Sequence, residues 1–291
     1  MLSLVLPKGS LESATLSLFE AADLTVRRGS DRDYRAAIDD PRIDRVMFLR
    51  PQEIPQYVEQ GLFDLGITGR DWITETDSDV ISVTELEYSK ATSNPVKIVL
   101  AVPKEHPAST GAELPNGVRV STEFPELTRR FFAQAGVEAV IVPSYGATEA
   151  KVPDIVDAIV DLTETGTSLR KHGLKVIETL LVSRTELVTN AATWGDPEKR
   201  AAIEDVATLL LGAINARGKV LLKLNCPDSA LDAVLAELPA MTSPTVTALA
   251  NGGFHAVETV VPKQGVNTLI PALKGAGARD ILELPIAKIV E

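Results

Sequence analysis

The stretch from Asp154 to Leu169 constrains the fold more than any other part of the chain. An apolar run, Ala158 to Val160, is followed by Asp161 and then by a short segment of small, hydroxylated residues. A helix-compatible segment begins at Leu169. This order predicts a buried strand, a tight loop and the start of a helix, a connection that is typical of α/β proteins.

The loop in this connection is suited to a phosphate group. It consists of Thr163, Glu164, Thr165, Gly166, Thr167 and Ser168. Glycine lets the backbone fold closely around an anion, while hydroxyls, free N–H groups and the start of a helix can all donate to it. The acidic residues just upstream, Asp154, Asp157 and Asp161, can hold ribose hydroxyls or the water shell of a magnesium ion. We therefore expect a 5-phosphoribosyl pocket. The alternative is an ordinary strand-to-helix connection with Thr167 or Ser168 as the N-cap.

Composition and charge narrow the class of protein. With 291 residues, of which 45% are hydrophobic, the chain is long enough for two or three domains. Its apolar runs, such as Ile98 to Val102, are too short for a membrane span, and its first residues do not resemble a leader, so we expect a cytoplasmic protein. A formal net charge of -11 argues against nucleic-acid binding, although a local positive pocket can still receive a small anion. With Cys226 as the only cysteine and three scattered histidines, a transition-metal cluster is not expected.

The N-terminal part repeats a strand, turn and helix. Strands are predicted over residues 2–6, 44–49 and 65–67, and a helix follows each of them. Lys8, Arg50 and the Gly69 to Asp71 turn come directly after these strands. Because open α/β sheets bind ligands at the carboxyl ends of their strands, we expect these groups to share one rim. Ser10 is predicted to cap the first helix, and Pro51 to start the second.

A second α/β lobe is predicted after a change of pattern at residues 91–95. Strands are expected over residues 96–102, 118–121, 138–142, 158–160 and 174–182, with a helix opened by residues 122–128 and a loop over residues 144–149. We assign residues 1–93 to lobe I and 94–184 to lobe II. Residues 185–216 return to lobe I and contain a helix capped by Asp196. Two such lobes joined by two crossings form a Venus-flytrap architecture with a cleft between them.

The last part, residues 217–291, predicts a small separate domain. Strands and helices are expected in the order βαββαβ, over residues 220–224, 228–238, 245–249, 254–261, 265–275 and 280–284. This order is the ferredoxin-like arrangement, and its length suits an independent domain.

Several ordered motifs together resemble the long form of ATP phosphoribosyltransferase over essentially the whole chain. They are Pro7-Lys8-Gly9-Ser10-Leu11, Arg50-Pro51 with Ile54-Pro55-x-Tyr57-Val58, Gly66-Ile67-Thr68-Gly69-x-Asp71, Thr122-Glu123-Phe124-Pro125-x-Leu127-Thr128 and Asp157 to Leu169. The resemblance implies a periplasmic-binding-protein-like (type II) catalytic core and transfer of a phosphoribosyl group to N1 of ATP with Mg²⁺. It also implies a C-terminal ACT-type domain that mediates inhibition by histidine, and a homohexamer built from dimers.

The resemblance also implies roles for particular residues. Lys8, Arg50 and Asp157 are expected to be catalytic, and Asp154, Asp157, Asp161 and the loop from Thr163 to Ser168 to bind phosphoribosyl pyrophosphate. ATP is expected to contact Lys8, Gly9, Ser10, Arg50, Gly69, Asp71, Thr122, Glu123, Phe124 and Glu149. Histidine is expected at Asn225, Met241, Thr245 and Asp280. No direct magnesium ligand is identified, and the ion is expected to be held mainly by substrate phosphates. Lys8 and Ser10 stand where arginine is common in the family, so the phosphate contacts of that turn differ.

Two other functions share this architecture. A prephenate dehydratase-like enzyme would also combine a two-lobe core with an ACT-type domain, but it gives no reason for the loop from Thr163 to Ser168. A solute-sensing protein would also have a flytrap core, and the chain shows neither an export signal nor a DNA-binding domain to support that function.

Overall fold

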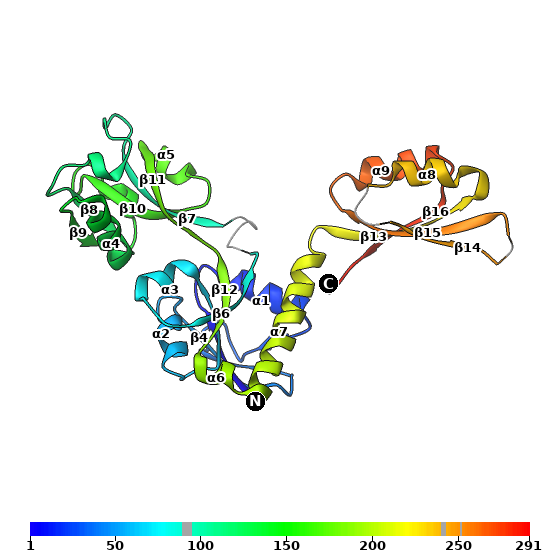
Figure 1. The fold of residues 1–291 in the computed structure, drawn as a ribbon, viewed down its shortest axis with the longest axis horizontal. Helices are drawn as coiled ribbons and strands as arrows, with labels where there is room; N and C mark the ends of the chain where they lie inside the picture. Colours follow the sequence, from blue (N-terminus) through cyan, green and yellow to red (C-terminus); the bar gives the residue numbers. More distant parts are fainter. Residues whose placement is uncertain (89–94, 240–242, 251) are drawn as a thin grey trace. The chain divides into compact units, whose positions relative to one another are not determined.

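The computed structural model describes residues 1–88, 95–239, 243–250 and 252–291, and it divides into two compact units, Met1–Thr208 and Leu209–Glu291 (Figure 1). No helix within the described residues is long and apolar enough to cross a membrane. The first unit contains two sheets and the second unit contains one. The predicted α/β class is confirmed, with a two-lobe core of the periplasmic-binding-protein type followed by a ferredoxin-like domain.

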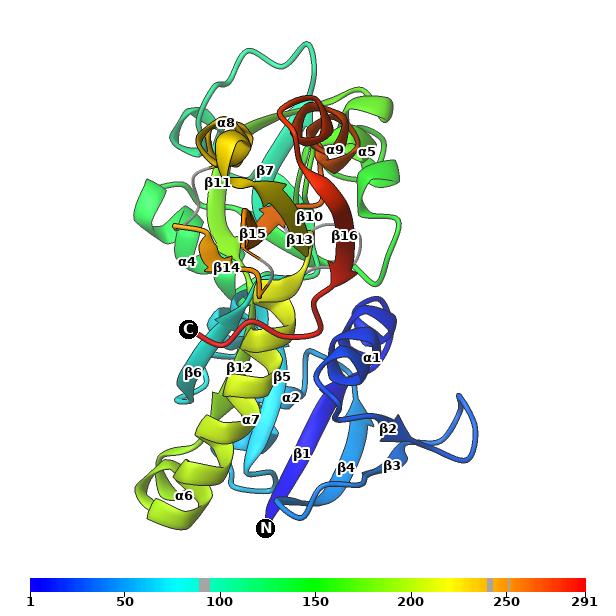
Figure 2. The same ribbon diagram turned by 90° about the vertical axis from the view of Figure 1, so that its right-hand side faces the viewer.

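The larger sheet of the first unit has seven strands in the order β2-β3-β4-β1-β5-β12-β6. Its strands are β1 (Leu2–Pro7), β2 (Val26–Arg27), β3 (Arg35–Ile38), β4 (Ile43–Leu49), β5 (Leu65–Gly69), β6 (Ile81–Leu86) and β12 (Thr185–Thr189). The accompanying helices are α1 (Glu12–Ala21), α2 (Ile54–Glu59), α3 (Arg70–Thr76), α6 (Ala191–Gly195) and α7 (Pro197–Ala216). Strand β1 runs parallel to β4 and β5 on either side of it (Figure 2). Its residues from Leu4 to Leu6 are fully buried, as the continuous apolar run predicts for a central parallel strand.

The second sheet of this unit has five strands in the order β11-β7-β10-β8-β9. Its elements are β7 (Val96–Pro103), β8 (Arg119–Thr122), α4 (Pro125–Ala135), β9 (Val140–Pro143), β10 (Ala158–Thr163), α5 (Thr167–Lys171) and β11 (Leu174–Ser183). Short 3-10 helices cover Gly111–Glu113 and Thr148–Lys151. Strands β8, β9 and β10 are parallel to one another, so their carboxyl ends lie along one edge.

The second unit carries a four-stranded antiparallel sheet in the order β14-β15-β13-β16. Its elements are β13 (Lys219–Pro227), a 3-10 helix (Asp228–Ala230), α8 (Leu231–Glu237), β14 (Thr245–Ala248), β15 (Phe254–Pro262), α9 (Val266–Gly275) and β16 (Arg279–Pro285). Both helices cover the same face of the sheet (Figure 1), where Leu222 and Leu224 pack with Val234 and Leu273. The predicted βαββαβ order is confirmed.

Helix starts differ from the sequence predictions at three places. Helix α1 begins at Glu12 after Leu11, and Ser10 makes no capping hydrogen bond. Instead, the Glu12 carboxylate accepts from the N–H of Gly9 at 3.2 Å. Helix α2 begins at Ile54 with Pro55, not Pro51, in its first turn, and helix α5 is preceded by Gly166 in the left-handed conformation.

Strand β12 was not predicted as a strand, although it pairs with both β5 and β6 inside the larger sheet. Its sequence contains Glu186, a residue type that rarely lies in a sheet interior. The structure buries Glu186 to 1% exposure and pairs both of its carboxylate oxygens with the Arg70 guanidinium at 2.6 Å. The ion pair with Arg70 offsets the cost of burying the Glu186 carboxylate in this strand.

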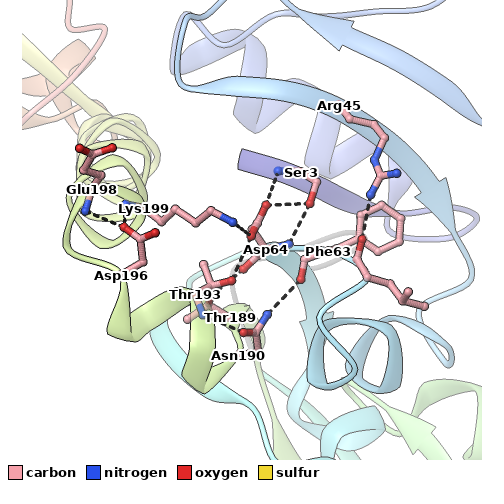
Figure 3. Close-up of polar contacts among 11 residues, drawn as sticks. Ser3, Arg45, Phe63, Asp64, Thr189, Asn190, Thr193, Asp196, Glu198 and Lys199 are labelled. Carbon is pink, nitrogen blue, oxygen red and sulfur yellow. Dashed lines mark hydrogen bonds and ion pairs between the residues drawn. The ribbon is translucent and has the colours of Figure 1, made fainter. Parts of the chain in front are cut away.

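The carboxylate of Asp64 ties the returning segment to the larger sheet (Figure 3). It accepts from the N–H and hydroxyl of Ser3, both at 2.8 Å, from the hydroxyl of Thr193 at 3.0 Å and from the Lys199 ammonium at 2.6 Å. Asn190 adds a hydrogen bond to the carbonyl oxygen of Phe63 at 3.2 Å. Strand β1, the start of β5, and helices α6 and α7 therefore meet at one side chain.

We expect Asp64→Asn to lower the free energy of unfolding by about 2 kcal/mol, because the Lys199 ammonium loses its charged partner. Burial alone would raise the pKa of Asp64, but hydrogen bonds from Lys199 and Ser3 outweigh it and hold the pKa below its usual 3.8. A lowered carboxyl pKa stabilises the fold above the unfolded-state pKa, and this contribution is lost as the pH falls through the folded-state pKa. The difference between variant and wild type, measured by urea unfolding, should therefore shrink below about pH 3.8.

Asp205→Asn is the matched control. Asp205 is 67% exposed and lies 3.5 Å from the Arg42 guanidinium, so its loss should change the free energy of unfolding by less than about 1 kcal/mol. Equal effects of the two substitutions would contradict a structural role for Asp64.

Candidate active site

A cavity of about 410 Å³ in the first unit brings together residues from both of its sheets. Elements of the larger sheet contribute Lys8, Ser10, Arg50, Pro51, Gln52 and Trp72. Elements of the second sheet contribute Glu123, Phe124, Gly146, Ala147, Thr148, Glu149, Asp161 and Leu162. Seven residues predicted from sequence therefore share one cavity: Lys8, Ser10, Arg50, Glu123, Phe124, Glu149 and Asp161.

The first wall of the cavity carries two cationic side chains. Lys8 follows β1 and Arg50 follows β4, and because Pro7 pairs with Leu49 in this parallel ladder the two side chains emerge at the same edge. The Lys8 ammonium donates to the carbonyl oxygen of Asp31 at 3.3 Å and lies 4.4 Å from the centre of the Tyr34 ring. Among the described residues neither cation forms an ion pair with a carboxylate, so both are available to an anion.

Gly9 allows the turn between Lys8 and helix α1. Its φ is +103°, a conformation that other residues rarely adopt. A Cβ at this position would also lie 3.7 Å from the Arg50 guanidinium. That distance is an ordinary contact, so glycine is needed at this position for its backbone conformation.

The opposite wall carries three carboxylates. Burial raises the pKa of Asp161 to about 6, with nearby Glu149 and Glu123 adding to the shift and Lys151 opposing it. The pKa of Glu149 is lowered, first by a backbone hydrogen bond and then by the hydroxyl of Ser168, which donates to Glu149 Oε1 at 2.7 Å. The cavity therefore has positive charge on one side and negative charge on the other, the distribution that a metal–phosphate substrate requires.

The loop from Thr163 to Ser168 leaves the same edge of the second sheet and is preformed. Gly166 has a φ of +70°, and its N–H donates to the hydroxyl of Thr163 at 2.8 Å. Arg170 donates to the carbonyl oxygen of Thr165 at 2.9 Å and to the hydroxyl of Thr167 at 3.1 Å. The N–H groups of Thr167 and Ser168 open helix α5 and so have no acceptor within it. The loop offers backbone N–H groups and hydroxyls to an anion.

A second cavity, of about 190 Å³, shares Ser10, Pro51, Trp72 and Leu162 with the first. It is lined by the predicted residues Gly69, Asp71 and Glu164. Asp71 is 4% exposed, its carboxylate accepts from the Ser183 hydroxyl at 2.9 Å, and burial raises its pKa. A Cβ on Gly69 would lie 1.9 Å from Asp71 Oδ1, so the glycine is required for this packing. Asp71 braces the turn at the edge of the cavity.

The structure does not bring Asp154, Asp157 or Thr122 to the cavity. Asp157 precedes β10, whereas the loop follows it, and the six-residue strand separates them by roughly 20 Å. Asp157 instead pairs with the Arg119 guanidinium at 2.7 Å, and Asp154 lies exposed in the preceding turn. Thr122 is fully buried, and its hydroxyl accepts from the N–H of Phe124 at 2.9 Å. The structure therefore does not support the expectation that Asp157 acts at the ribose, whereas Asp161, in the second half of β10, lines the cavity.

Seven lining residues were not among the predicted site residues: Pro51, Gln52, Trp72, Gly146, Ala147, Thr148 and Leu162. Trp72 directly follows the predicted Gly69 to Asp71 turn, which is the signal that could have identified it. Its ring lies 4.7 Å from that of Phe124, measured between centroids, and tilted by 36°. Phe124 is 2% exposed, so the half-buried Trp72 ring, which packs on it, supplies the aromatic part of the cavity wall.

The predicted effector residues lie in the second unit. The Asn225 amide donates to Asp280 Oδ2 at 3.0 Å, and Asp280 has a φ of +50°. Thr245 pairs with Glu258 on β15, whereas Asn225 pairs with Ala256, which separates Thr245 from Asn225 by two strands and roughly 12 Å. Met241 lies outside the described residues. Within one chain, the structure brings together Asn225 and Asp280 but not Thr245.

The donor set in the first cavity fits a magnesium ion that is held mostly by a substrate. Within residues 1–88, 95–239, 243–250 and 252–291, no group of three or more His, Cys, Asp and Glu side chains could hold a metal ion. Mg²⁺ commonly uses one or two carboxylates, several waters and substrate phosphates. Asp161 and Glu149 supply such oxygens on one wall of the cavity.

Comparison with known proteins gives consistent matches over the whole chain. The family model described as ATP phosphoribosyltransferase matches residues 50–212, and the model described as HisG, C-terminal domain, matches residues 216–288. The ATP phosphoribosyltransferase of Pelotomaculum thermopropionicum is 47% identical over 291 residues, 99% of each chain. That of Pelodictyon phaeoclathratiforme is also 47% identical, over 100% of this chain and 98% of its own.

A solved structure agrees with these relatives. The ATP phosphoribosyl transferase (HisG:HisZ) complex from Thermotoga maritima contains a chain with a TM-score of 0.61 and 27% identity, covering 72% of this chain and 98% of its own. The matched family models and the full-length relatives show that this chain belongs to the ATP phosphoribosyltransferase family.

Proposed function

We propose that this chain transfers the phosphoribosyl group of phosphoribosyl pyrophosphate to N1 of the adenine ring of ATP. The products are phosphoribosyl-ATP and pyrophosphate. The observation that carries the proposal is the single cavity that joins Lys8 and Arg50 to Asp161, next to a preformed loop rich in hydroxyls. A dehydratase or a solute sensor gives no reason for this combination.

Phosphoribosyl pyrophosphate is proposed to bind across the cavity. Its 5-phosphate would accept hydrogen bonds from the N–H groups of Thr167 and Ser168 and from the hydroxyls of Thr165 and Thr167, and its ribose hydroxyls would donate to Asp161. Its pyrophosphate would face Lys8 and Arg50, which have no carboxylate partner among the described residues. Glu149 supports this arrangement because it holds the Ser168 hydroxyl.

ATP is proposed to bind beside it, at the Gly69 to Asp71 turn and at Glu123 and Phe124. Trp72, which is half-buried and packs on the buried Phe124 ring, gives the adenine ring an apolar surface to stack on. Buried Asp71 and Thr122 would act by bracing the two turns rather than by touching the nucleotide.

The proposed chemistry is a displacement at the anomeric carbon. Positive charge develops on the ribose while negative charge develops on the departing pyrophosphate, so a carboxylate near the sugar and cations near the leaving group stabilise the transition state. The lone pair of adenine N1 is the nucleophile, and holding it in line with the bond that breaks lowers the entropy cost of the reaction. Magnesium, when bound, would neutralise phosphate charge, with Asp161 and Glu149 accepting from its water shell.

Regulation and assembly are proposed from the family resemblance. We propose inhibition by histidine through the second unit, with Asn225 and Asp280 as contacts, and a homohexamer built from dimers. The proposed boundaries are 1–93 and 185–216 for lobe I, 94–184 for lobe II and 217–291 for the regulatory domain. Membership of β12 in the larger sheet supports the return to lobe I. Because both substrates are cytoplasmic metabolites, we propose a cytoplasmic location.

The reaction is tested by mixing the protein with ATP, phosphoribosyl pyrophosphate and Mg²⁺ and following both adenine-ring absorbance and pyrophosphate release. We expect both signals to require all three components and to stop when a chelator removes the metal. Histidine titrated into the same mixture should lower the rate. A folded protein that gives no product would refute the enzyme assignment, and a rate unchanged at saturating histidine would refute the regulatory one.

Asp161→Asn should stabilise the protein at pH 7 while lowering kcat/KM by at least about 100-fold. A raised carboxyl pKa means that the folded state binds more protons than the unfolded state between about pH 3.8 and 6, so stability falls as the pH rises through this window. Asparagine removes this penalty. The difference between the usual pKa of 3.8 and about 6, discounted because Asp161 is half-buried, corresponds to a gain of about 1–2 kcal/mol in the free energy of unfolding.

The control for this variant is Asp154→Asn, in the turn that precedes the same strand. We expect it to change turnover by less than about twofold and the free energy of unfolding by less than about 0.5 kcal/mol, since Asp154 is exposed. An Asp161→Asn enzyme with normal turnover would remove Asp161 from the site.

Gly166→Val should raise the KM for phosphoribosyl pyrophosphate by at least about 20-fold while the KM for ATP changes by less than about threefold. Valine is strained at a φ of +70°, and its Cβ would lie 2.9 Å from the Arg170 guanidinium that organises the loop. Gly136→Val is the control, because Gly136 has a φ of +71° with open space around it and lies at the C-terminal end of helix α4, outside the loop. Equal effects of Gly166→Val on both substrates would contradict the placement of the 5-phosphate.

A further inference from the structure

We propose that Glu75, on helix α3, is a positioning residue for ATP: it caps helix α4 of the other lobe and so fixes the turn that carries Glu123 and Phe124. The proposal rests on the proposed function, because that function places ATP at this turn. No motif in the sequence singled out Glu75, and it lines neither of the cavities that hold the candidate site.

Helix α4 cannot cap its own N-terminus. A helix normally begins with a Ser, Thr, Asp or Asn whose side chain accepts from the N–H groups two and three positions later. Here the N-cap is Phe124, which has no acceptor, and Pro125 at the next position has no N–H. The N–H groups of Glu126 and Leu127 are therefore left to be satisfied from outside the helix.

Glu75 satisfies both of them. One carboxylate oxygen accepts from the N–H of Glu126 at 2.9 Å, and the other accepts from the N–H of Leu127 at 2.8 Å. These are the two donors that a local N-cap residue would serve, yet Glu75 lies about 50 residues earlier and on a helix that packs with the larger sheet. The start of α4 is thus held by the lobe opposite its own.

The environment of Glu75 shows that this contact is built into the interior. The residue is 8% exposed, and the N-terminus of an 11-residue helix favours a negative charge. Burial raises its pKa more than the two N–H donors lower it, while Glu126 adds to the shift and Arg130 opposes it. The two N–H donors and the helix dipole offset only part of the cost of desolvating the Glu75 carboxylate.

Two further contacts join helices α3 and α4, so these helices form one interface between the lobes. The Trp72 ring of α3 packs on Phe124, and Arg130 of α4 donates to the carbonyl oxygen of Thr74. Phe124 is therefore fixed on one side by Trp72 and at its own backbone by Thr122, while Glu75 holds the residues that follow it. Figure 1 shows α3 and α4 next to each other.

We expect the binding of the two substrates to depend unequally on this interface between α3 and α4. Glu123 and Phe124 line the cavity directly before the capped turn, so loosening the start of α4 displaces them. The loop from Thr163 to Ser168 is held by Thr163 and Arg170, both within its own strand and helix. Loss of Glu75 should therefore weaken ATP binding and leave phosphoribosyl pyrophosphate binding nearly unchanged.

The test compares Glu75→Ala, Glu75→Gln and Glu126→Gln in the full-length enzyme by steady-state kinetics with each substrate varied in turn. We expect Glu75→Ala to raise the KM for ATP by at least about tenfold, with the KM for phosphoribosyl pyrophosphate changed by less than about threefold. Glu75→Gln should give a smaller rise, because its amide oxygen still accepts from one N–H. Glu126→Gln removes an exposed carboxylate from the same helical turn but no contact between the lobes, so both KM values should stay within about twofold.

A purely structural role would lower kcat through the fraction of active enzyme and would leave the ratio of the two KM values unchanged, and that result would overturn the proposal. If Glu75→Ala does not fold, Glu75→Gln decides: a KM for ATP equal to that of the wild type refutes the positioning role. Glu123→Gln separates this inference from the proposed function. If Glu123→Gln raises the KM for ATP and the Glu75 variants do not, only the inference fails; if neither does, the placement of ATP at this turn fails as well.

Discussion

Buried and partly buried carboxylates that accept hydrogen bonds from distant segments hold the first unit together. Asp64 joins the start of the chain to helices α6 and α7, and Glu186 joins β12 to Arg70 at the start of α3. Asp71 and Glu75, one turn apart on α3, reach Ser183 and helix α4. A buried charge without partners would destabilise the fold by several kcal/mol, so each of these acids requires the segment that supplies its donors to be in place. Helix α3 therefore links the two lobes through polar contacts as well as through the Trp72 ring.

Asp161, in the cavity, differs from these four carboxylates. Among the described residues, Asp161 accepts a hydrogen bond from the N–H of Leu162 at 2.7 Å, and burial, with Glu149 and Glu123 adding to the effect, raises its pKa to about 6. Such a residue destabilises the empty protein at neutral pH, and it would gain favourable interactions when a metal ion, a ribose hydroxyl or a developing positive charge comes close. Asp64 and Asp161 thus differ in a way that separates structural from functional carboxylates: the first is fully satisfied by the chain itself, and the second is left for a ligand.

Apolar runs were sufficient to predict most strands of the fold, including the central strands β1, β7 and β10, because parallel and buried strands need continuous hydrophobic sequence. They were insufficient for β12, where an ion pair compensates for Glu186.

The residues of the candidate site could also be predicted only in part. Strand direction alone brings residues that follow β1, β4 and β8 to one cavity together with Asp161 of β10. Asp157 was assigned to the site because it is close in sequence to the loop, but an extended strand of six residues carries it to the far edge.

The two proposed halves of the substrate site are stabilised over different distances in the sequence. The phosphoribosyl loop is held by contacts between residues no more than five positions apart, together with one hydrogen bond from Ser168 to Glu149. The turn at Glu123 and Phe124 depends on Thr122 nearby and on Glu75 from the other lobe. Local contacts persist whenever the second sheet is folded, whereas the cap from Glu75 exists only while the two lobes keep their present contact. A change in the contact between the lobes would therefore weaken ATP binding first, and the loop proposed to bind the 5-phosphate would keep its conformation.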